Sequence, residues 1–169
     1  ILEDEVVGEE AKKLFADAQA MLLSIANENW LEHKGVVGIF AANAVQDDIE
    51  VYDESGRCVH TISTMRQQLQ KAAGVPNIAL SDFIAPKDSD KTDYIGGFVV
   101  TSGIGIEGKI NAFEADHDDY NSILLKALAD RLAEAFAEFL HEKVRKEIWG
   151  YAQSEALSNE SLIKEEYLG

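Results

Sequence analysis

Residues 118–148 read DDYNSILLKALADRLAEAFAEFLHEKVRKEI, and this stretch decides the fold. Leucine, alanine, glutamate, lysine and arginine, which are all strong helix formers, dominate it. Its apolar residues recur at intervals of three and four positions, which is the spacing of one face of an α-helix. The pattern predicts one long amphipathic helix over residues 118 to about 148, ended by Gly150. The predicted apolar stripe consists of Ile123, Leu124, Ala127, Leu128, Leu132, Ala135, Phe136, Phe139, Leu140 and Val144.

The residues around the start of this helix, FEADHDDYN at 113–121, crowd four carboxylates and a histidine together. They could form a metal site, an acid–base pair or a helix start. Consecutive residues cannot converge on one ion without a loop of defined turns, and the stretch lacks the Asp-x-Asp-x-Asp-Gly pattern of a calcium loop. Asp116 or Asp118 can instead accept hydrogen bonds from the first free N–H groups of the helix, whose positive end favours carboxylates. We interpret the stretch as a helix start and assign no metal ligand to it.

The other segments predict an α+β fold. Gly35 and Gly38 suggest a close approach of the backbone to a neighbouring group. TSGIGIEG at 101–108 fits turn chemistry better than a phosphate-binding loop, because neither a GK[ST] ending nor a GxGxxG pattern occurs there. The expected elements are an amphipathic helix over 7–27, strands near 36–40, 47–53 and 57–63 in an antiparallel meander, a short helix over 65–74 ended by Gly74, a central strand over 94–101, and a helix that begins at Ser158 or Asn159.

Composition restricts the classes of function. The chain has 169 residues, of which 46% are hydrophobic, so it can bury one sizeable core and we expect a single domain over residues 1–169. Thirty-one acidic against fifteen basic residues give a net charge of −16, which repels nucleic acid. The longest apolar run is too short to span a bilayer, so we expect no membrane partner. Cys58 stands alone, which excludes an intrachain disulfide and fits a reducing, cytoplasmic compartment.

Charged residues recur every fourth position along one face of the long helix. Lys126 can pair with Asp130, and Glu142 can pair with Lys146. Asp130, Glu134 and Glu138 have no basic partner four residues further on, and like charges at this spacing repel one another. Two interpretations stay open: a solvated helix face, or a face that receives a positively charged ligand or a basic domain.

No catalytic group emerges from the residues alone. The four histidines show no metal-ligand spacing, and no serine lies in a G-x-S-x-G elbow. We therefore assign neither catalytic residues nor metal ligands.

Long segments match one known family in order: KGVVGIFAANAVQDDIEVY (34–52), MRQQLQK (65–71), SDFIAPKDSDKTDYIGGFVVTSG (81–103), FEADHDDYNSILLKALADRLAEAFAEFLHEKVRKEIWGYA (113–152) and LSNESLIKEEY (157–167). Together they closely resemble the C-terminal activation domain of cobalamin-dependent methionine synthase. The resemblance implies a bent antiparallel sheet flanked by helices. It also implies binding of S-adenosylmethionine and docking on the cobalamin-binding domain of the same enzyme. There an electron from flavodoxin or an equivalent reductase, and a methyl group from the sulfonium, restore cobalamin held by that other domain.

The family's principal donor-binding segments, one resembling R-P-A-P-G-Y and one resembling D-W-T-P-F-F, have no counterpart in the 169 residues. Relative to the family we therefore expect a domain that is truncated at both ends and inactive in isolation. We expect it to bind the donor weakly or not at all. The family resemblance makes Asp130, Glu134 and Glu138 the candidates to face S-adenosylmethionine or the cobalamin domain.

The alternative is a stand-alone binding module that caps a corrinoid protein or recruits flavodoxin without binding the donor. For an acidic flavodoxin, Lys143, Arg145 and Lys146 are the expected basic patch.

Overall fold

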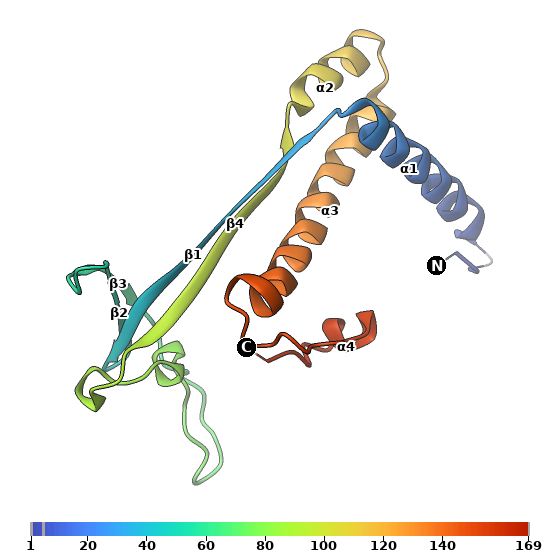
Figure 1. Ribbon diagram of the computed structural model, residues 1–169. Coiled ribbons are helices and arrows are strands. Elements are labelled where there is room, and N and C mark those ends of the chain that lie inside the picture. The colour runs from blue at the N-terminus through green and yellow to red at the C-terminus, as the bar shows by residue number, and fades with distance from the viewer. Residues whose placement is uncertain (1, 5, 169) are drawn as a thin grey trace. The chain divides into compact units, whose positions relative to one another are not determined.

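The computed structural model describes residues 2–4 and 6–168; Ile1, Glu5 and Gly169 lie outside the described residues. The chain divides into two compact units, which we call the helical unit (residues 1–36 and 99–169) and the hairpin unit (residues 37–98). That both units belong to one domain stays a prediction. The elements labelled in Figure 1 are, in chain order, α1 (Gly8–Glu28), β1 (Glu32–Val45), β2 (Asp48–Tyr52), β3 (Cys58–Ser63), β4 (Asp93–Ile104), α2 (Ile106–Ala115), α3 (Asp119–Lys143) and α4 (Asn159–Ile163).

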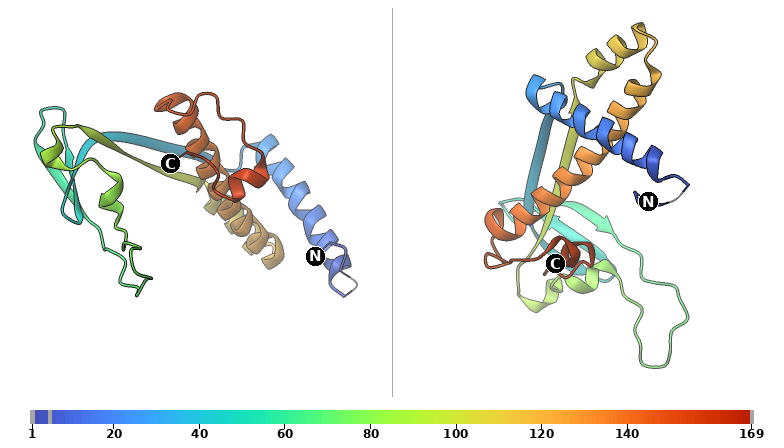
Figure 2. Two further views of the ribbon diagram at one scale, coloured as in Figure 1. Left: turned by 90° about the horizontal axis from the view of Figure 1, so that it is seen from below. Right: turned by 90° about the vertical axis from the view of Figure 1, so that its right-hand side faces the viewer.

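The core of the helical unit forms where α1 meets α3. Figure 2 shows α1 lying across α3. Its buried apolar side chains are Met21, Ile25, Leu31, Leu124, Leu125, Leu128 and Ala129. Trp30 and Phe113 pack against this cluster with their rings edge to face, 6.2 Å between centroids. The predicted helices over 7–27 and 118–148 are thereby confirmed.

The start of α3 agrees with the interpretation of the acidic stretch before it. The carboxylate of Asp118 accepts a hydrogen bond of 3.0 Å from the backbone N–H of Asn121 and one of 2.7 Å from the Asn121 side chain. These two bonds lower the pKa of the Asp118 carboxyl, the side-chain bond being the larger cause. Asp118, rather than Asp116, is the N-cap. Ser158 caps α4 in the same way, through Ser161.

The buried side of α3 differs from the predicted stripe. Leu125 is fully buried and Ala129 is buried with it, although the prediction omitted both. Ile123 is 66% exposed and Phe139 is 58% exposed, and Ala127 and Ala135 are exposed too, so the prediction was wrong at these four positions. Leucine and alanine are so dense in this helix that several overlapping stripes have helical spacing. The neighbours that pack against α3 decide which stripe is buried.

The strands form one four-stranded sheet in the order β3–β2–β1–β4. β1 and β2 pair antiparallel with Ala44 opposite Ile49, and β2 and β3 pair antiparallel with Ile49 opposite Ile62. The antiparallel meander predicted from the sequence is therefore confirmed, within an α+β fold. β4 was expected to be central, but it lies at the end of the strand order and Val99 on it is exposed.

Two predictions of local structure were wrong. Residues 106–115 form α2, which begins after Gly105 at φ +90°, where the sequence indicated only a turn. Residues 65–74 form no helix but part of a long loop of the hairpin unit, visible in Figure 2. Here the N–H of Gln67 donates to the carbonyl of Ile78 at 3.0 Å, so it bonds across the loop instead of within a helical turn.

The guanidinium of Arg66 holds this loop in place. It contacts Asp47 at 2.7 Å and Asp82 at 2.6 Å, and it donates to the carbonyl of Asn77 at 2.8 Å. The hydrogen bonds from Arg66 are the main cause that lowers the pKa of Asp82 from its ordinary 3.8 to about 2. The contacts of Arg66 with residues distant in sequence therefore hold residues 65–74 as a loop, although the local sequence favours a helix.

Replacing Gly35 by alanine should destabilise the helical unit. A Cβ at Gly35 would lie 3.1 Å from both Phe136 Cζ and Leu140 Cδ2, so the close approach predicted for this glycine is confirmed. We expect Gly35→Ala to lower the free energy of unfolding by about 1–3 kcal/mol, measured by urea denaturation. Gly97→Ala is the matched control, because nothing lies within 4 Å of its Cβ position. Equal stability of the two variants would contradict the close packing of α3 on β1.

The Arg66–Asp82 pair should make stability depend on acid pH. The pKa of Asp82 is lower in the folded state, so its contribution to stability is present above the unfolded value of 3.8 and is lost as pH falls towards about 2. We expect the difference in unfolding free energy between the parent chain and Asp82→Asn to shrink across this range. Urea denaturation at pH values between 5 and about 2 measures it, and a difference independent of pH would contradict the assignment.

Candidate functional site

The three carboxylates singled out in the sequence lie on one side of α3. Asp130, Glu134 and Glu138 are four residues apart and all exposed. The half-buried Leu132 lies two positions after Asp130 and two positions before Glu134. Two positions turn an α-helix by about 200°, so both carboxylates lie on the side of α3 opposite to Leu132. We call these three residues the acidic face. It points away from the core, so the fold leaves the face open to an external group.

The charge pairing of the acidic face differs from the expected one. Arg131 contacts Glu134 at 2.7 Å, so Glu134 has a basic partner three residues before it. Lys126 was expected to pair with Asp130 but contacts Glu114 of α2 at 3.5 Å. Among the residues that the structure describes, neither Asp130 nor Glu138 forms an ion pair with a lysine or an arginine, and the charge of Glu138 acts on His141 three residues further on. The face therefore keeps an excess of negative charge.

A hollow of about 320 Å³ lies beside Glu138, between the end of α3 and α4. Asn159, Leu162 and Ile163 of α4 line its other sides. Ile163 is 83% exposed, so an apolar surface stands in solvent next to a carboxylate. This combination suits a ligand that carries a positive charge on an apolar body. Sequence spacing could not indicate the hollow, because α4 follows Glu138 by more than twenty residues.

A buried ion pair anchors the segment that carries α4. The Arg145 side chain is 1% exposed and that of Glu155 is 8% exposed. Two parallel hydrogen bonds join them, Nε to Oε2 at 2.9 Å and Nη2 to Oε1 at 2.6 Å. The bonds to Arg145 lower the pKa of Glu155, and the bonds to Glu155 raise the pKa of Arg145. Both groups thus carry charge inside the protein.

The basic patch expected near the end of the long helix is wrong. Arg145 is buried, and Lys143 and Lys146 contact Glu147 at 2.6 Å and Glu142 at 3.1 Å. The Glu142–Lys146 pair itself was predicted and is confirmed. Each cation faces a carboxylate of the same chain, so these three residues form no patch of uncompensated positive charge.

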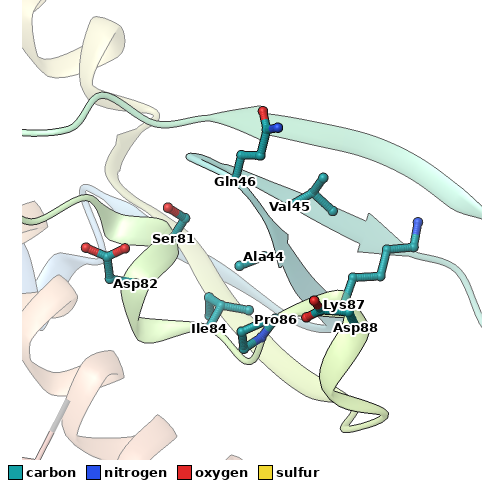
Figure 3. Close-up of a pocket in the computed structure, with 9 residues that line it drawn as sticks. All are labelled: Ala44, Val45, Gln46, Ser81, Asp82, Ile84, Pro86, Lys87 and Asp88. Atoms are coloured by element: carbon teal, nitrogen blue, oxygen red, sulfur yellow. The ribbon is translucent and has the colours of Figure 1, made fainter.

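The hairpin unit contains a separate hollow of about 710 Å³ (Figure 3). Ala44 lines it from the end of β1 and Gln46 from the β1–β2 turn, and Ser81, Ile84 and Pro86 line it from the segment between β3 and β4. The hydroxyl of Ser81 is buried and has no hydrogen-bond partner among the described residues. No feature of the sequence pointed to this hollow, since its walls come from two segments that lie more than thirty residues apart in the chain.

Neither a metal cluster nor a membrane-spanning helix is found among the described residues. Residues 2–4 and 6–168 contain no group of three or more histidine, cysteine, aspartate or glutamate side chains arranged to hold a metal ion. In the same residues, no helix has the length and apolar character needed to cross a membrane.

The comparisons with known proteins agree with each other. The sequence profile of the family described as "Vitamin B12 dependent methionine synthase, activation domain" matches residues 1–169. A crystal structure of the MetH reactivation domain bound to AdoHcy (S-adenosylhomocysteine) is 57% identical to this chain and superposes with a TM-score of 0.92. The match covers 100% of this chain and 52% of the crystallised chain, so the present chain spans about half the length of that relative.

Proposed function

The chain belongs to the activation-domain family of vitamin B12-dependent methionine synthase, and from this membership we propose that it helps to bind S-adenosylmethionine for the reactivation of cobalamin. The observation that carries the proposal is the bound AdoHcy in a relative that is 57% identical over the whole of this chain. AdoHcy is what remains of S-adenosylmethionine after its methyl group has left. A site that binds the one is built to recognise most of the other.

The acidic face supports this proposal by its charge. S-adenosylmethionine carries a positive sulfonium and an α-ammonium group, and the carboxylates of Asp130, Glu134 and Glu138 are suited to either. We propose Glu134 as the principal contact, because it lies at the centre of the face. Its ion pair with Arg131 is exposed and therefore weak, so a ligand cation can compete for the carboxylate.

In the proposed reaction the chain binds and orients the donor, and it docks on the cobalamin-binding domain of the same enzyme. Cobalamin, held by that other domain, supplies the methyl-accepting cobalt. An electron from flavodoxin or an equivalent reductase accompanies the methyl transfer, which leaves S-adenosylhomocysteine on this chain. The contribution of the chain is proximity: it holds the sulfonium methyl at a defined position instead of leaving it to diffuse.

Isothermal titration with S-adenosylmethionine tests donor binding. We expect little or no heat of binding when the donor is titrated into the 169-residue chain. We expect clear binding when the chain is joined to the flanking segments of the crystallised relative, because that relative binds AdoHcy and has about twice the length of this chain. The fused segments alone serve as the control. If the joined chain does not bind the donor, donor binding fails, and a module that caps a corrinoid protein without the donor becomes the better explanation.

Replacing Glu134 by glutamine in the full-length gene product should slow reactivation. Loss of one charged contact to the donor should reduce the reactivation rate at low donor concentration by about tenfold, while ordinary methyl transfer continues. The rate is followed by the absorbance of cobalamin as it returns to its methylated form. Glu142→Gln is the matched control, since Glu142 belongs to the same helix but pairs with Lys146 outside the acidic face. Equal reactivation in the two variants would remove the role of Glu134.

A further inference from the structure

We propose that Arg145 is a positioning residue, which holds residues 150–168 against the end of α3. It thereby maintains the hollow beside Glu138, a residue of the acidic face that we propose to contact the donor. The inference rests on the proposed function for the identity of the ligand. The arrangement of Arg145 and its contacts rests on the structure alone.

Arg145 lies on the same side of the helix as Glu138. Seven residues separate them, and seven positions are almost two full helical turns. At Glu138 this side of the helix is exposed, whereas at Arg145 it is buried. The difference arises because the chain after Gly150 folds back over the end of the helix. The N–H of Ala152 donates to the carbonyl of Arg145 at 2.9 Å, so backbone and side chain of Arg145 both contact the returning segment.

The side chain of Arg145 contacts the returning segment on both sides of α4. Glu155, which precedes α4, takes the two hydrogen bonds of the guanidinium. Tyr167, which follows α4, lies with its ring 4.6 Å from the guanidinium carbon. His141 meets the same ring edge to face, with 4.9 Å between centroids. Because α4 is held before and after its five residues, the positions of Leu162 and Ile163 depend on this one cation.

The turn that carries Arg145 also departs from an ordinary helix. Val144–Ile148 form a π-helical turn, in which the N–H of Trp149 donates to the carbonyl of Val144, five residues earlier. π turns are rare and occur frequently at functional sites. Removing either charge of the buried pair would leave the other without compensation in a dry environment. Residues 150–168 would then leave the end of α3, and the wall of the hollow formed by Leu162 and Ile163 would leave with them.

The hollow suits the charged end of the donor better than its neutral product. Glu138 supplies a carboxylate and α4 supplies apolar contacts, so a sulfonium gains more there than a thioether does. We therefore expect Glu138→Gln to weaken binding of S-adenosylmethionine more than binding of S-adenosylhomocysteine. Glu147→Gln is the control, because Glu147 pairs with Lys143 and does not line the hollow.

The positioning role is tested with Arg145→Met in the full-length gene product. Hydrogen exchange at the amide of Ala152, which donates to the carbonyl of Arg145, reports the fraction of molecules in which residues 150–168 stay docked, and isothermal titration with S-adenosylhomocysteine reports affinity. If the docked fraction falls to about one tenth, the dissociation constant should rise about tenfold, because only the docked state binds. Arg145→Lys, which keeps the charge but not the paired hydrogen bonds, should have a docked fraction and an affinity between those of the parent protein and those of Arg145→Met. Lys143→Met, which removes an exposed ion pair at the same helix end, should change neither.

The outcomes separate the two proposals. Parent protein that does not bind S-adenosylhomocysteine overturns the proposed function. Parent protein that binds, together with Arg145→Met that exchanges faster but binds equally well, overturns the positioning role. If Arg145→Met does not fold, Arg145→Lys replaces it, because this variant keeps the positive charge and removes the paired hydrogen bonds to Glu155. Exchange and affinity in Arg145→Lys equal to those of the parent protein would then overturn the inference.

Discussion

The packing of Leu125, Leu128 and Ala129 of α3 against Met21 and Ile25 of α1 is the contact on which the helical unit depends. One side of a 25-residue helix is buried by it, and the opposite side is left to carry charge. Because a helix rises about 1.5 Å per residue, Asp130 and Glu138 are held about 12 Å apart on a rigid rod. That span is comparable to the length of a small-molecule ligand. The burial that stabilises the fold therefore also sets the spacing of the acidic face.

Burial separates the charged pairs of α3 into two kinds. Arg131 and Glu134 meet in solvent, where water and salt screen their attraction and either group can exchange partners. Arg145 and Glu155 meet inside the protein, where breaking the pair leaves an uncompensated charge. The first pair can yield to a ligand and the second cannot. The binding surface that we propose and the contact that supports it thus both use arginine–glutamate pairs, one exposed and one buried.

The comparisons and the geometry contribute different parts of the functional conclusion. Family membership follows from a profile match over all 169 residues and from a relative that is 57% identical. The geometry shows which groups of this chain are available: an open acidic face, a hollow beside Glu138, and a returning segment held by Arg145. Our proposal that the carboxylates of α3 contact a cationic methyl donor draws on both parts.

The sequence by itself determined the elements whose signals are local. The long helix, the start of each capped helix to within two candidate cap residues, and the β1–β2–β3 meander were predictable, because helix periodicity, capping and strand alternation act between residues close in the chain. Only the tertiary structure decided which stripe of α3 is buried, why residues 65–74 form a loop around Arg66, and that Arg145 is buried by Glu155 and Tyr167. Each of these depends on a partner distant in sequence or on the competition between neighbours for one surface, and the spacing of residues along the chain carries no record of either.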